Sequence, residues 1–225
     1  PARADRPTGA PRWTPDDPAT RPAANRPGTS GDFRFEATSV HAVLVRAASS
    51  RRIAGDVLAV ARAHWYLRGA RSIGERVRLW GRPAVAARGD IHVGERTQLV
   101  STLAPLELVT EPGAEIRIGS RCLVNFGTSI IAHERVTIGD RTLIGTDCMI
   151  TDTGFHGVEP DRRFDPPPPQ PVTIGENVWL AARVIVLPGV TIGDDAVIGI
   201  GSVVTTNIPP RALAVGSPAR VVKEL

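Results

Sequence analysis

The sequence predicts an all-β fold, a parallel β-helix that follows a short helical segment and carries one protruding loop. Three observations predict it. A motif of an aliphatic residue, glycine and a polar residue recurs along the chain, and aliphatic residues follow it at six-residue intervals. The composition is 42% hydrophobic but only 4% aromatic, which suits many short stacked strands filled with Val, Ile, Leu and Ala.

The recurring motif marks successive coils of this helix. It stands at Ile73-Gly74-Glu75, Val93-Gly94-Glu95, Ile118-Gly119-Ser120, Ile138-Gly139-Asp140, Ile174-Gly175-Glu176 and Ile192-Gly193-Asp194. Three hexads make a triangular coil, as in the sets Ile138, Ile144, Ile150; Ile174, Leu180, Val186; and Ile192, Ile198, Val204. Each aliphatic residue should point inward, with Gly, Asn or Asp accommodating the turns. Periodicity alone leaves the handedness open.

Two breaks in the rhythm indicate departures from the coil. The coil after Ile130 opens at Ile138, two residues late, which implies a small bulge. Between Ile150 and Ile174 one six-residue step would have sufficed, so residues 151–171 must leave the helix as a protruding loop. Long excursions from a regular solenoid are usually functional.

The chain divides into three predicted regions. Residues 1–32 are rich in Pro, Arg, Ala, Asp and Thr and have the composition of a disordered or draped tail. Residues 33–70 are predicted to form a helical cap, with Val57, Val60 and Trp65 among the residues at helical spacing. The repeats begin near residue 73, so residues 71–225 are predicted to form the β-helix domain. The helical segment before them would cover the first coil, because terminal coils need a cover.

Charge excludes one class of partner. The net charge is +4, Lys223 is the sole lysine, and no motif of a nucleic-acid reader is present, so we expect no nucleic acid as a partner. Eight arginines between Arg46 and Arg78 face two acidic residues. Peripheral contact with an anionic membrane is one interpretation; a cap whose arginines face water is the favoured one. No apolar run is long enough to span a bilayer and no signal-peptide core is present, so we expect a cytoplasmic protein.

The two cysteines are predicted to be packing residues. Cys122 and Cys148 occupy small-residue positions in different repeats, and no Cys/His cluster with zinc-ligand spacing surrounds them. We therefore expect no metal, and a reducing compartment fits this usage.

Candidate catalytic residues gather in the loop. His156 stands between two glycines and is the leading candidate for a general base, because imidazole titrates near neutrality and can accept a hydroxyl proton. Asp152 and Arg162 could reach an acceptor, and Asp152 could also orient His156. His133 lies at the smaller irregularity and is a further candidate for acceptor binding. Solvated loop charges are the alternative for these residues.

Residues 174–225, which include Val-Leu-Pro-Gly-Val-Thr-Ile-Gly-Asp and end in Gly-Ser-Pro-Ala-Arg-Val-Val-Lys, resemble the end of the hexapeptide-repeat acyltransferases. Within that family they are most similar to the galactoside and maltose O-acetyltransferases and the polysaccharide O-acetyltransferases. The resemblance is good over residues 116–225, loose over 73–112 and absent from 1–70. It implies a left-handed β-helix, a homotrimer and active sites between neighbouring subunits.

The resemblance also assigns residues. The family's loop histidine aligns with His156, and the asparagine that helps to hold the acceptor aligns with Asn125. The coenzyme contacts that it implies are Trp179, Ala181, Ala182, Ile200, Thr205, Arg220 and Lys223. Relatives have glycine and a small polar residue where this chain has Ala181 and Ala182, and often an acidic residue near the position of His133.

The function that the resemblance implies is O-acyl transfer from acetyl-CoA, or another acyl-CoA, to a hydroxyl of a sugar, glycan or glycosylated metabolite. His156 would remove the hydroxyl proton during direct attack on the thioester, and a backbone N–H near Ala182 would bind the oxyanion. No acyl-enzyme and no metal are needed. The alternatives are N-acylation of an amino sugar or nucleotide sugar, and a non-catalytic β-helix scaffold.

Overall fold

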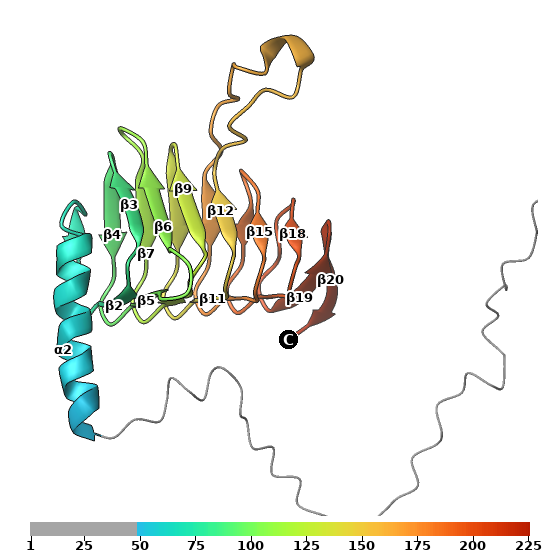
Figure 1. The fold of residues 1–225 in the computed structure, drawn as a ribbon. Coiled ribbons are helices and arrows are strands. Elements are labelled where there is room, and N and C mark those ends of the chain that lie inside the picture. Colours follow the sequence, from blue (N-terminus) through green and yellow to red (C-terminus); the bar gives the residue numbers. More distant parts are fainter. Residues whose placement is uncertain (1–48) are drawn as a thin grey trace, which may run out of the picture. The chain divides into compact units, whose positions relative to one another are not determined.

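The computed structural model describes residues 49–225, shown in Figure 1. The predictions for residues 1–32, and for 33–48 of the helical cap, lie outside the described residues. Residues Ala47–Leu225 form one compact unit.

This unit is a left-handed parallel β-helix of about seven turns, which confirms the predicted fold class. Its strands form three sheets. Sheet 1 contains β1 (Ser72–Ile73), β4 (Asp90–Val93), β7 (Glu115–Ile118), β10 (Arg135–Ile138), β13 (Val172–Ile174) and β16 (Thr191–Ile192). Sheet 2 contains β2 (Arg78–Gly81), β5 (Gln98–Ser101), β8 (Leu123–Val124), β11 (Leu143–Ile144), β14 (Trp179–Leu180), β17 (Val197–Ile198), β19 (Ala212–Gly216) and β20 (Ala219–Glu224). Sheet 3 contains β3 (Ala84–Ala87), β6 (Glu107–Thr110), β9 (Ser129–Ala132), β12 (Met149–Thr151), β15 (Ile185–Val186) and β18 (Val203–Val204).

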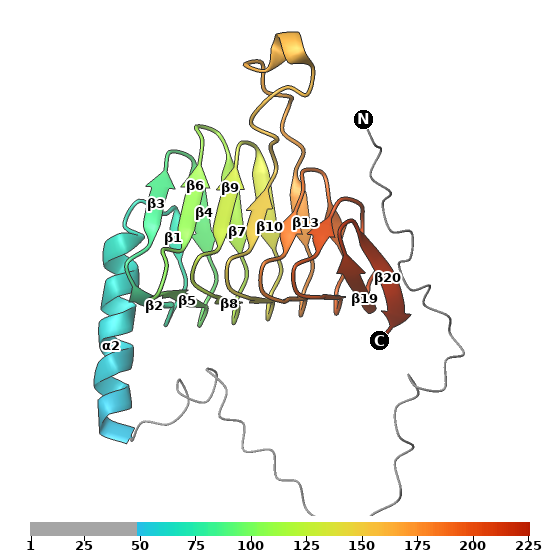
Figure 2. The ribbon, with the colours of Figure 1, turned by 45° about the vertical axis from the view of Figure 1, so that its right-hand side comes forward.

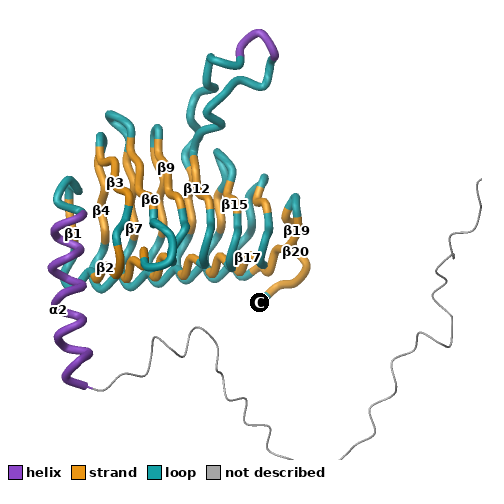
Figure 3. Tube along the Cα trace, in the orientation of Figure 1, coloured by secondary structure: helices purple, strands orange, loops and turns teal. Residues whose placement is uncertain are grey.

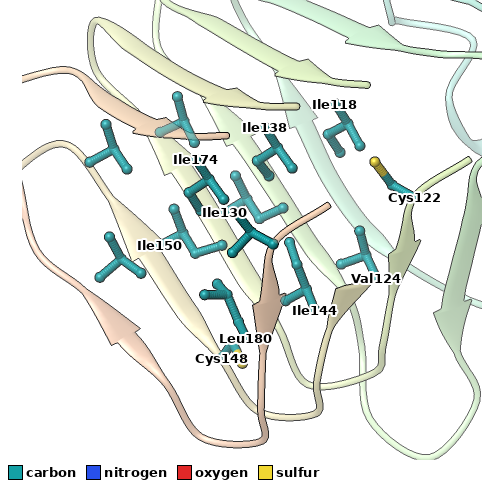
Figure 4. Packing of buried hydrophobic residues seen from close by; sticks show 14 of the residues in the cluster. Ile118, Cys122, Val124, Ile130, Ile138, Ile144, Cys148, Ile150, Ile174 and Leu180 are labelled. Carbon is teal, nitrogen blue, oxygen red and sulfur yellow. The ribbon is translucent and has the colours of Figure 1, made fainter. Parts of the chain in front are cut away.

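The predicted aliphatic hexads fill the interior. Ile138, Ile144 and Ile150 contribute one buried side chain to each sheet, and Figure 4 shows them stacked with the residues of neighbouring coils. Ile138 lies in register with Ile174, and Ile144 with Leu180. Burying each such side chain stabilises the fold by about 1.5–3 kcal/mol. A shifted register would misalign these side chains between coils, so the six-residue spacing also fixes how the coils stack.

The corner between sheets 1 and 2 differs from the prediction. A residue with left-handed φ stands there in each coil, and five of these residues are arginines that we call the arginine corner: Arg76, Arg96, Arg121, Arg141 and Arg211, with φ from 54° to 58°. Asn177 and Asp195 hold this position in the two coils between Arg141 and Arg211. The prediction that Gly, Asn or Asp accommodates the turns is therefore incomplete. The left-handed conformation costs roughly 1–2 kcal/mol, and hydrogen bonds such as Arg96 N–H to Glu75 O at 2.7 Å offset it.

Both ends of the β-helix are covered. Helix α2 (Ser49–Tyr66) lies over the first coil (Figures 1 and 2), and no helix within residues 49–225 is long and apolar enough to cross a membrane. Its buried face contains Ala59 and Ala63 and is continued by Leu67, whereas Val57 and Trp65 are exposed. The helical spacing thus predicted the helix but not its buried face. At the other end, β20 pairs antiparallel with β19.

One segment leaves the solenoid. The chain departs after β12, passes through the 3-10 turn η2 (Pro160–Arg162) and returns at β13, and Figure 3 shows this loop extending well beyond the short turns of the other coils. It carries His156 and is the feature that positions the candidate site.

Candidate active site

The ring of His156 is held by a backbone carbonyl. Its Nδ1 lies 2.9 Å from the carbonyl oxygen of Arg163, which belongs to the same loop. Because a carbonyl oxygen only accepts hydrogen bonds, Nδ1 must carry a hydrogen, and the neutral ring then has its lone pair on Nε2. The side chain is exposed. The structure therefore presents a proton acceptor to solvent on the far side of the ring.

Gly157 lets the loop close next to this histidine. A Cβ at Gly157 would lie 2.2 Å from the carbonyl oxygen of Arg162 and 3.0 Å from that of Asp165. At Gly154 the nearest atom to such a Cβ is 3.6 Å away, on Pro167, which is ordinary contact. Of the two glycines, only Gly157 stands where the loop's own backbone leaves no room for a side chain.

Asp152 ties the base of the loop to the coil below. Its buried carboxylate accepts backbone hydrogen bonds from His133 at 2.8 Å and from Glu134 and Arg135 at 2.7 Å each. These three amides form the turn between β9 and β10, where the sequence showed the smaller irregularity. The structure thus gives Asp152 a role different from the predicted contacts with the acceptor and with His156.

His133 faces the loop. Its ring meets that of Phe155 edge to face, with the centroids 5.9 Å apart and an interplanar angle of 87°. The smaller irregularity and the loop, predicted as separate features, therefore meet at Phe155, the residue before His156. Arg162 lies on exposed η2, 3.7 Å from Glu159, and both side chains are more than half exposed, so this ion pair holds it only weakly.

Asn125 lies elsewhere on the coil. It follows β8 at the corner between sheets 2 and 3, where its Nδ2 donates to the carbonyl of Ile144 at 3.0 Å. The His156 loop leaves from the corner between sheets 3 and 1. A single chain therefore places these two predicted residues at different corners of the triangle.

Four predicted coenzyme residues gather at the corner that Asn125 occupies. Trp179 on β14 is 51% exposed, Ala181 and Ala182 follow it, and Ile200, 74% exposed, stands one coil further. The Gly201 N–H donates to the Ala182 carbonyl at 2.9 Å, which joins the two coils. The structure thus brings Trp179, Ala181, Ala182 and Ile200 together.

The Ala182 N–H is an available backbone donor at this corner. Ala181 N–H donates to Ile198 O at 2.9 Å and Arg183 N–H to Thr146 O at 2.8 Å. Between them, Ala182 N–H donates to no acceptor among the described residues. A free N–H on a rigid coil is the arrangement that binds a developing oxyanion.

The remaining coenzyme residues are more dispersed. Arg220 pairs with Val215 across β19 and β20. The Val215 side chain in turn packs against Gly199, where an added Cβ would lie 2.6 Å from it. Arg220 is therefore near the corner formed by Ala182 and Ile200, which we call the Ala182 corner. Lys223 pairs with Leu213, further along β20. Thr205 follows β18 at the corner between sheets 3 and 1.

The cysteines lie in the interior. The Sγ of Cys122 is 3.2 Å from the Gly139 carbonyl, and that of Cys148 is 3.2 Å from the Ala181 carbonyl. Burial raises the pKa of Cys122 to about 11 and also raises the pKa of Cys148. Such thiols are poor nucleophiles. Within the part of the chain that the structure describes, no group of three or more His, Cys, Asp and Glu side chains could hold a metal ion.

Sequence reasoning missed the contact that matters most to His156. The Arg163 group involved is a backbone carbonyl, which carries no residue signature. The tight packing at Gly157 had a signal, a glycine directly after the candidate base, but the sequence could not show which atoms approach it.

The repeats match known families. Residues 171–206 match the bacterial transferase hexapeptide (six repeats), and residues 135–159 match the hexapeptide repeat of succinyl-transferase. Galactoside O-acetyltransferase of Escherichia coli K12 is 44% identical over 113 residues, which is 50% of this chain and 56% of the relative. The same enzyme of Lactococcus lactis is 39% identical over 114 residues, with 50% and 55% covered. The chain spans about half the length of these curated relatives.

Solved structures share the fold. A hexapeptide-repeat acetyltransferase of Vibrio cholerae O1 biovar eltor, complexed with acetyl coenzyme A, gives a TM-score of 0.53 at 22% identity over 79% of this chain and 91% of that chain. A variant of an N-acyltransferase from Bacillus cereus, in complex with dTDP and coenzyme A, gives 0.58 at 19% identity over 79% and 90%. With the sequence matches, these findings confirm the resemblance: the chain carries the repeats of the hexapeptide-repeat acyltransferases and is similar to their galactoside O-acetyltransferase branch.

Proposed function

We propose that this chain is a CoA-dependent O-acetyltransferase that acts on a hydroxyl of a sugar, glycan or glycosylated metabolite by direct transfer. The observation that carries the proposal is the hydrogen bond between His156 Nδ1 and the Arg163 carbonyl, which leaves Nε2 as a proton acceptor on an exposed loop. The sequence similarity to galactoside O-acetyltransferases supports the reaction class.

The chemistry follows from that tautomer. Nε2 of His156 takes the proton of the acceptor hydroxyl while the hydroxyl oxygen bonds to the thioester carbonyl carbon. The negative charge that develops on the carbonyl oxygen is bound by the Ala182 N–H. When the tetrahedral species collapses, the C–S bond breaks, and the His156 imidazolium returns its proton to the coenzyme thiolate.

The cysteines support a direct route. An acyl-enzyme would need a reactive side-chain nucleophile. Both thiols are buried and their pKa values are raised, so neither supplies a thiolate near neutral pH. Unpaired thiols also suit the reducing cytoplasm, where we place the protein.

Acetyl-CoA, as the co-substrate, fits the Ala182 corner. Trp179 and Ile200 offer exposed apolar surface on two consecutive coils, and Ala182 offers the free backbone donor. Arg220 supplies positive charge suited to the coenzyme phosphates. Thr205 and Lys223 stay predicted contacts at the edge of this surface.

A homotrimer would complete the site. His156 and Asn125 lie at different corners of one chain, so a neighbouring subunit must bring its Asn125 corner to the loop. Leu143 and Trp179, in register on the outer face of sheet 2, are 45% and 51% exposed and provide apolar surface for such contact. We place His133, Asn125 and Arg162 on the acceptor side.

An acceptor panel tests the proposal. The full-length protein is incubated with acetyl-CoA and a set of sugars, glycans and amino sugars, and coenzyme release is followed together with product mass. An acetylated product that alkaline hydroxylamine cleaves is an ester and supports O-acetylation. A stable amide on an amino sugar would favour the N-acyltransferase instead. If the protein neither consumes nor binds acetyl-CoA, the scaffold becomes the better account.

A further inference from the structure

A cavity of about 690 Å³ lies between α2 and the first two coils. The residues that line it are Asp56, Val57, Val60, Arg76, Arg78 and Arg96. The candidate active site draws its loop from the fourth coil, so this cavity is separate from it along the β-helix. Its walls combine three guanidinium groups and one carboxylate with two valines, and the chemistry described so far uses none of them.

Two of the arginines stand directly above one another. Arg76 and Arg96 are successive members of the arginine corner, and the Arg96 N–H donates to the Glu75 carbonyl at 2.7 Å. Stacked coils repeat at about 4.8 Å, so the two side chains start close together. Both are exposed, and neither forms an ion pair with a residue in the described range. Two adjacent positive charges therefore border the cavity without a counter-charge from these residues.

Arg78 adds an unsatisfied donor. Its Nη1 lies 3.3 Å from Asp56 Oδ2, and its Cζ lies 5.8 Å from the centre of the Trp80 ring. Its Nε is buried and has no hydrogen-bond partner, the one such side-chain atom among the described residues. A buried donor left unpaired costs about 1–3 kcal/mol. The Arg78 guanidinium adds a third positive charge to the wall of the cavity.

The wall formed by α2 carries two aliphatic side chains beside Asp56. Val57 is 63% exposed and Val60 is half-buried. Exposed aliphatic side chains next to a group of arginines suit a ligand with an anionic end and an apolar end. Guanidinium groups match phosphate oxygens in both geometry and charge.

We propose that this cavity binds the phosphate ester of an apolar alcohol, with the phosphate at Arg76, Arg78 and Arg96 and the apolar part against Val57 and Val60. A membrane lipid headgroup and a water-soluble phosphate ester share this chemistry.

The test uses the full chain and two probes. Hexyl phosphate, titrated by calorimetry, represents the soluble source, and co-sedimentation with phosphatidylcholine vesicles that contain or lack phosphatidic acid represents the lipid source. Binding of hexyl phosphate alone assigns a soluble ligand, and binding to the phosphatidic acid vesicles assigns a lipid. Either should weaken as ionic strength rises, because salt screens the arginine charges.

The chain offers a matched control. Arg76→Asn with Arg96→Asn removes both stacked charges, and Asn177 already occupies the equivalent corner with φ of 52°, so the fold should tolerate asparagine there. Arg121→Asn changes the next member of the arginine corner, which lies outside the cavity and 3.7 Å from Glu95. We expect the double variant to bind at least about tenfold more weakly and the control to stay within about twofold.

Three results would overturn the proposal: no binding of either probe, equal loss in the double variant and in Arg121→Asn, or equal affinity for hexyl phosphate and inorganic phosphate. Turnover of acetyl-CoA with a soluble acceptor should be unchanged in the double variant, because these arginines lie outside the candidate active site. Failure here is therefore distinguishable from failure of the proposed acetyl transfer.

Discussion

The backbone N–H of His133 donates a 2.8 Å hydrogen bond to the buried carboxylate of Asp152. With the N–H groups of Glu134 and Arg135 on the same carboxylate, this contact joins the turn of the third coil to the point where the loop leaves the fourth. His156 follows Asp152 by only four residues. The position of the proposed general base thus depends on a turn that precedes it by some twenty residues.

Replacing Asp152 should loosen this junction. Asp152→Ala leaves three backbone donors without their acceptor, which we expect to lower the free energy of unfolding by on the order of 3 kcal/mol and the Tm by roughly 5–10 °C. Thermal denaturation followed by circular dichroism measures it. Asp165→Ala, at an exposed loop carboxylate, should change stability by less than about 0.5 kcal/mol. Equal effects of the two substitutions would contradict the account.

Gly157 gives a second test of the loop. Gly157→Ala places a methyl group 2.2 Å from the Arg162 carbonyl oxygen, so the loop must shift and His156 with it. A displacement of about 1 Å can cost roughly a hundredfold in rate, and we expect a loss of about ten- to a hundredfold in kcat/KM. Gly154→Ala meets nothing closer than 3.6 Å and should keep its activity. Loss in both variants, or in neither, would refute the distinction.

The coils were predictable because their cause is local. A core residue such as Ile144 recurs every six positions, and the failure of that rhythm between Ile150 and Ile174 marked the loop. The arginines of the corner were not predictable as turn residues, because their left-handed φ depends on hydrogen bonds to the neighbouring coil. The buried face of α2 was also missed, because Val57 and Trp65 share helical spacing with the residues that pack.

The candidate site was less predictable than the fold. His156 could be singled out because the loop was visible and the family resemblance pointed to it. Asp152 could be noticed but not explained, since its contacts are backbone amides of another coil. The Arg163 carbonyl that fixes the His156 tautomer has no sequence signature. Contacts made by main-chain atoms are set by tertiary structure, which sequence patterns do not record.

The outer face of sheet 2 should hold the proposed trimer together. Leu143→Glu places a charge in the apolar surface next to Trp179, so we expect the protein to dissociate from three chains to one and to lose acetyl transfer. Light scattering after size-exclusion chromatography gives the mass. Thr173→Glu, at an exposed position on sheet 1, is the matched control and should leave the trimer intact. A wild-type monomer with full activity would exclude the shared site.

The buried thiols predict an alkaline limit. The pKa of Cys122 is raised from 9.0 to about 11 in the fold, so the folded state keeps its proton where the unfolded state loses it. The contribution of this thiol to the free energy of unfolding is complete below pH 9 and is lost as pH rises through about 11, by up to about 1.4 kcal/mol per pH unit. Unfolding measured from pH 8 to 11 should show this slope, and Cys122→Ala should reduce it.

The same burial predicts chemical inertness. At pH 8 neither Cys122 nor Cys148 should react with Ellman's reagent in the folded protein, and both should react after unfolding in guanidinium chloride. Rapid labelling of the folded protein would contradict the interior placement of the thiols and would reopen a covalent route.

The central claim is that His156 is the base for acetyl transfer, and its most direct test is the rate of coenzyme release from acetyl-CoA with the best hydroxyl acceptor. We compare the wild type, His156→Ala and His64→Ala, the last changing an exposed histidine on α2. The account predicts a fall in kcat of at least about a hundredfold for His156→Ala, the size expected for loss of a general base, and wild-type turnover for His64→Ala. Wild-type turnover in His156→Ala would contradict it.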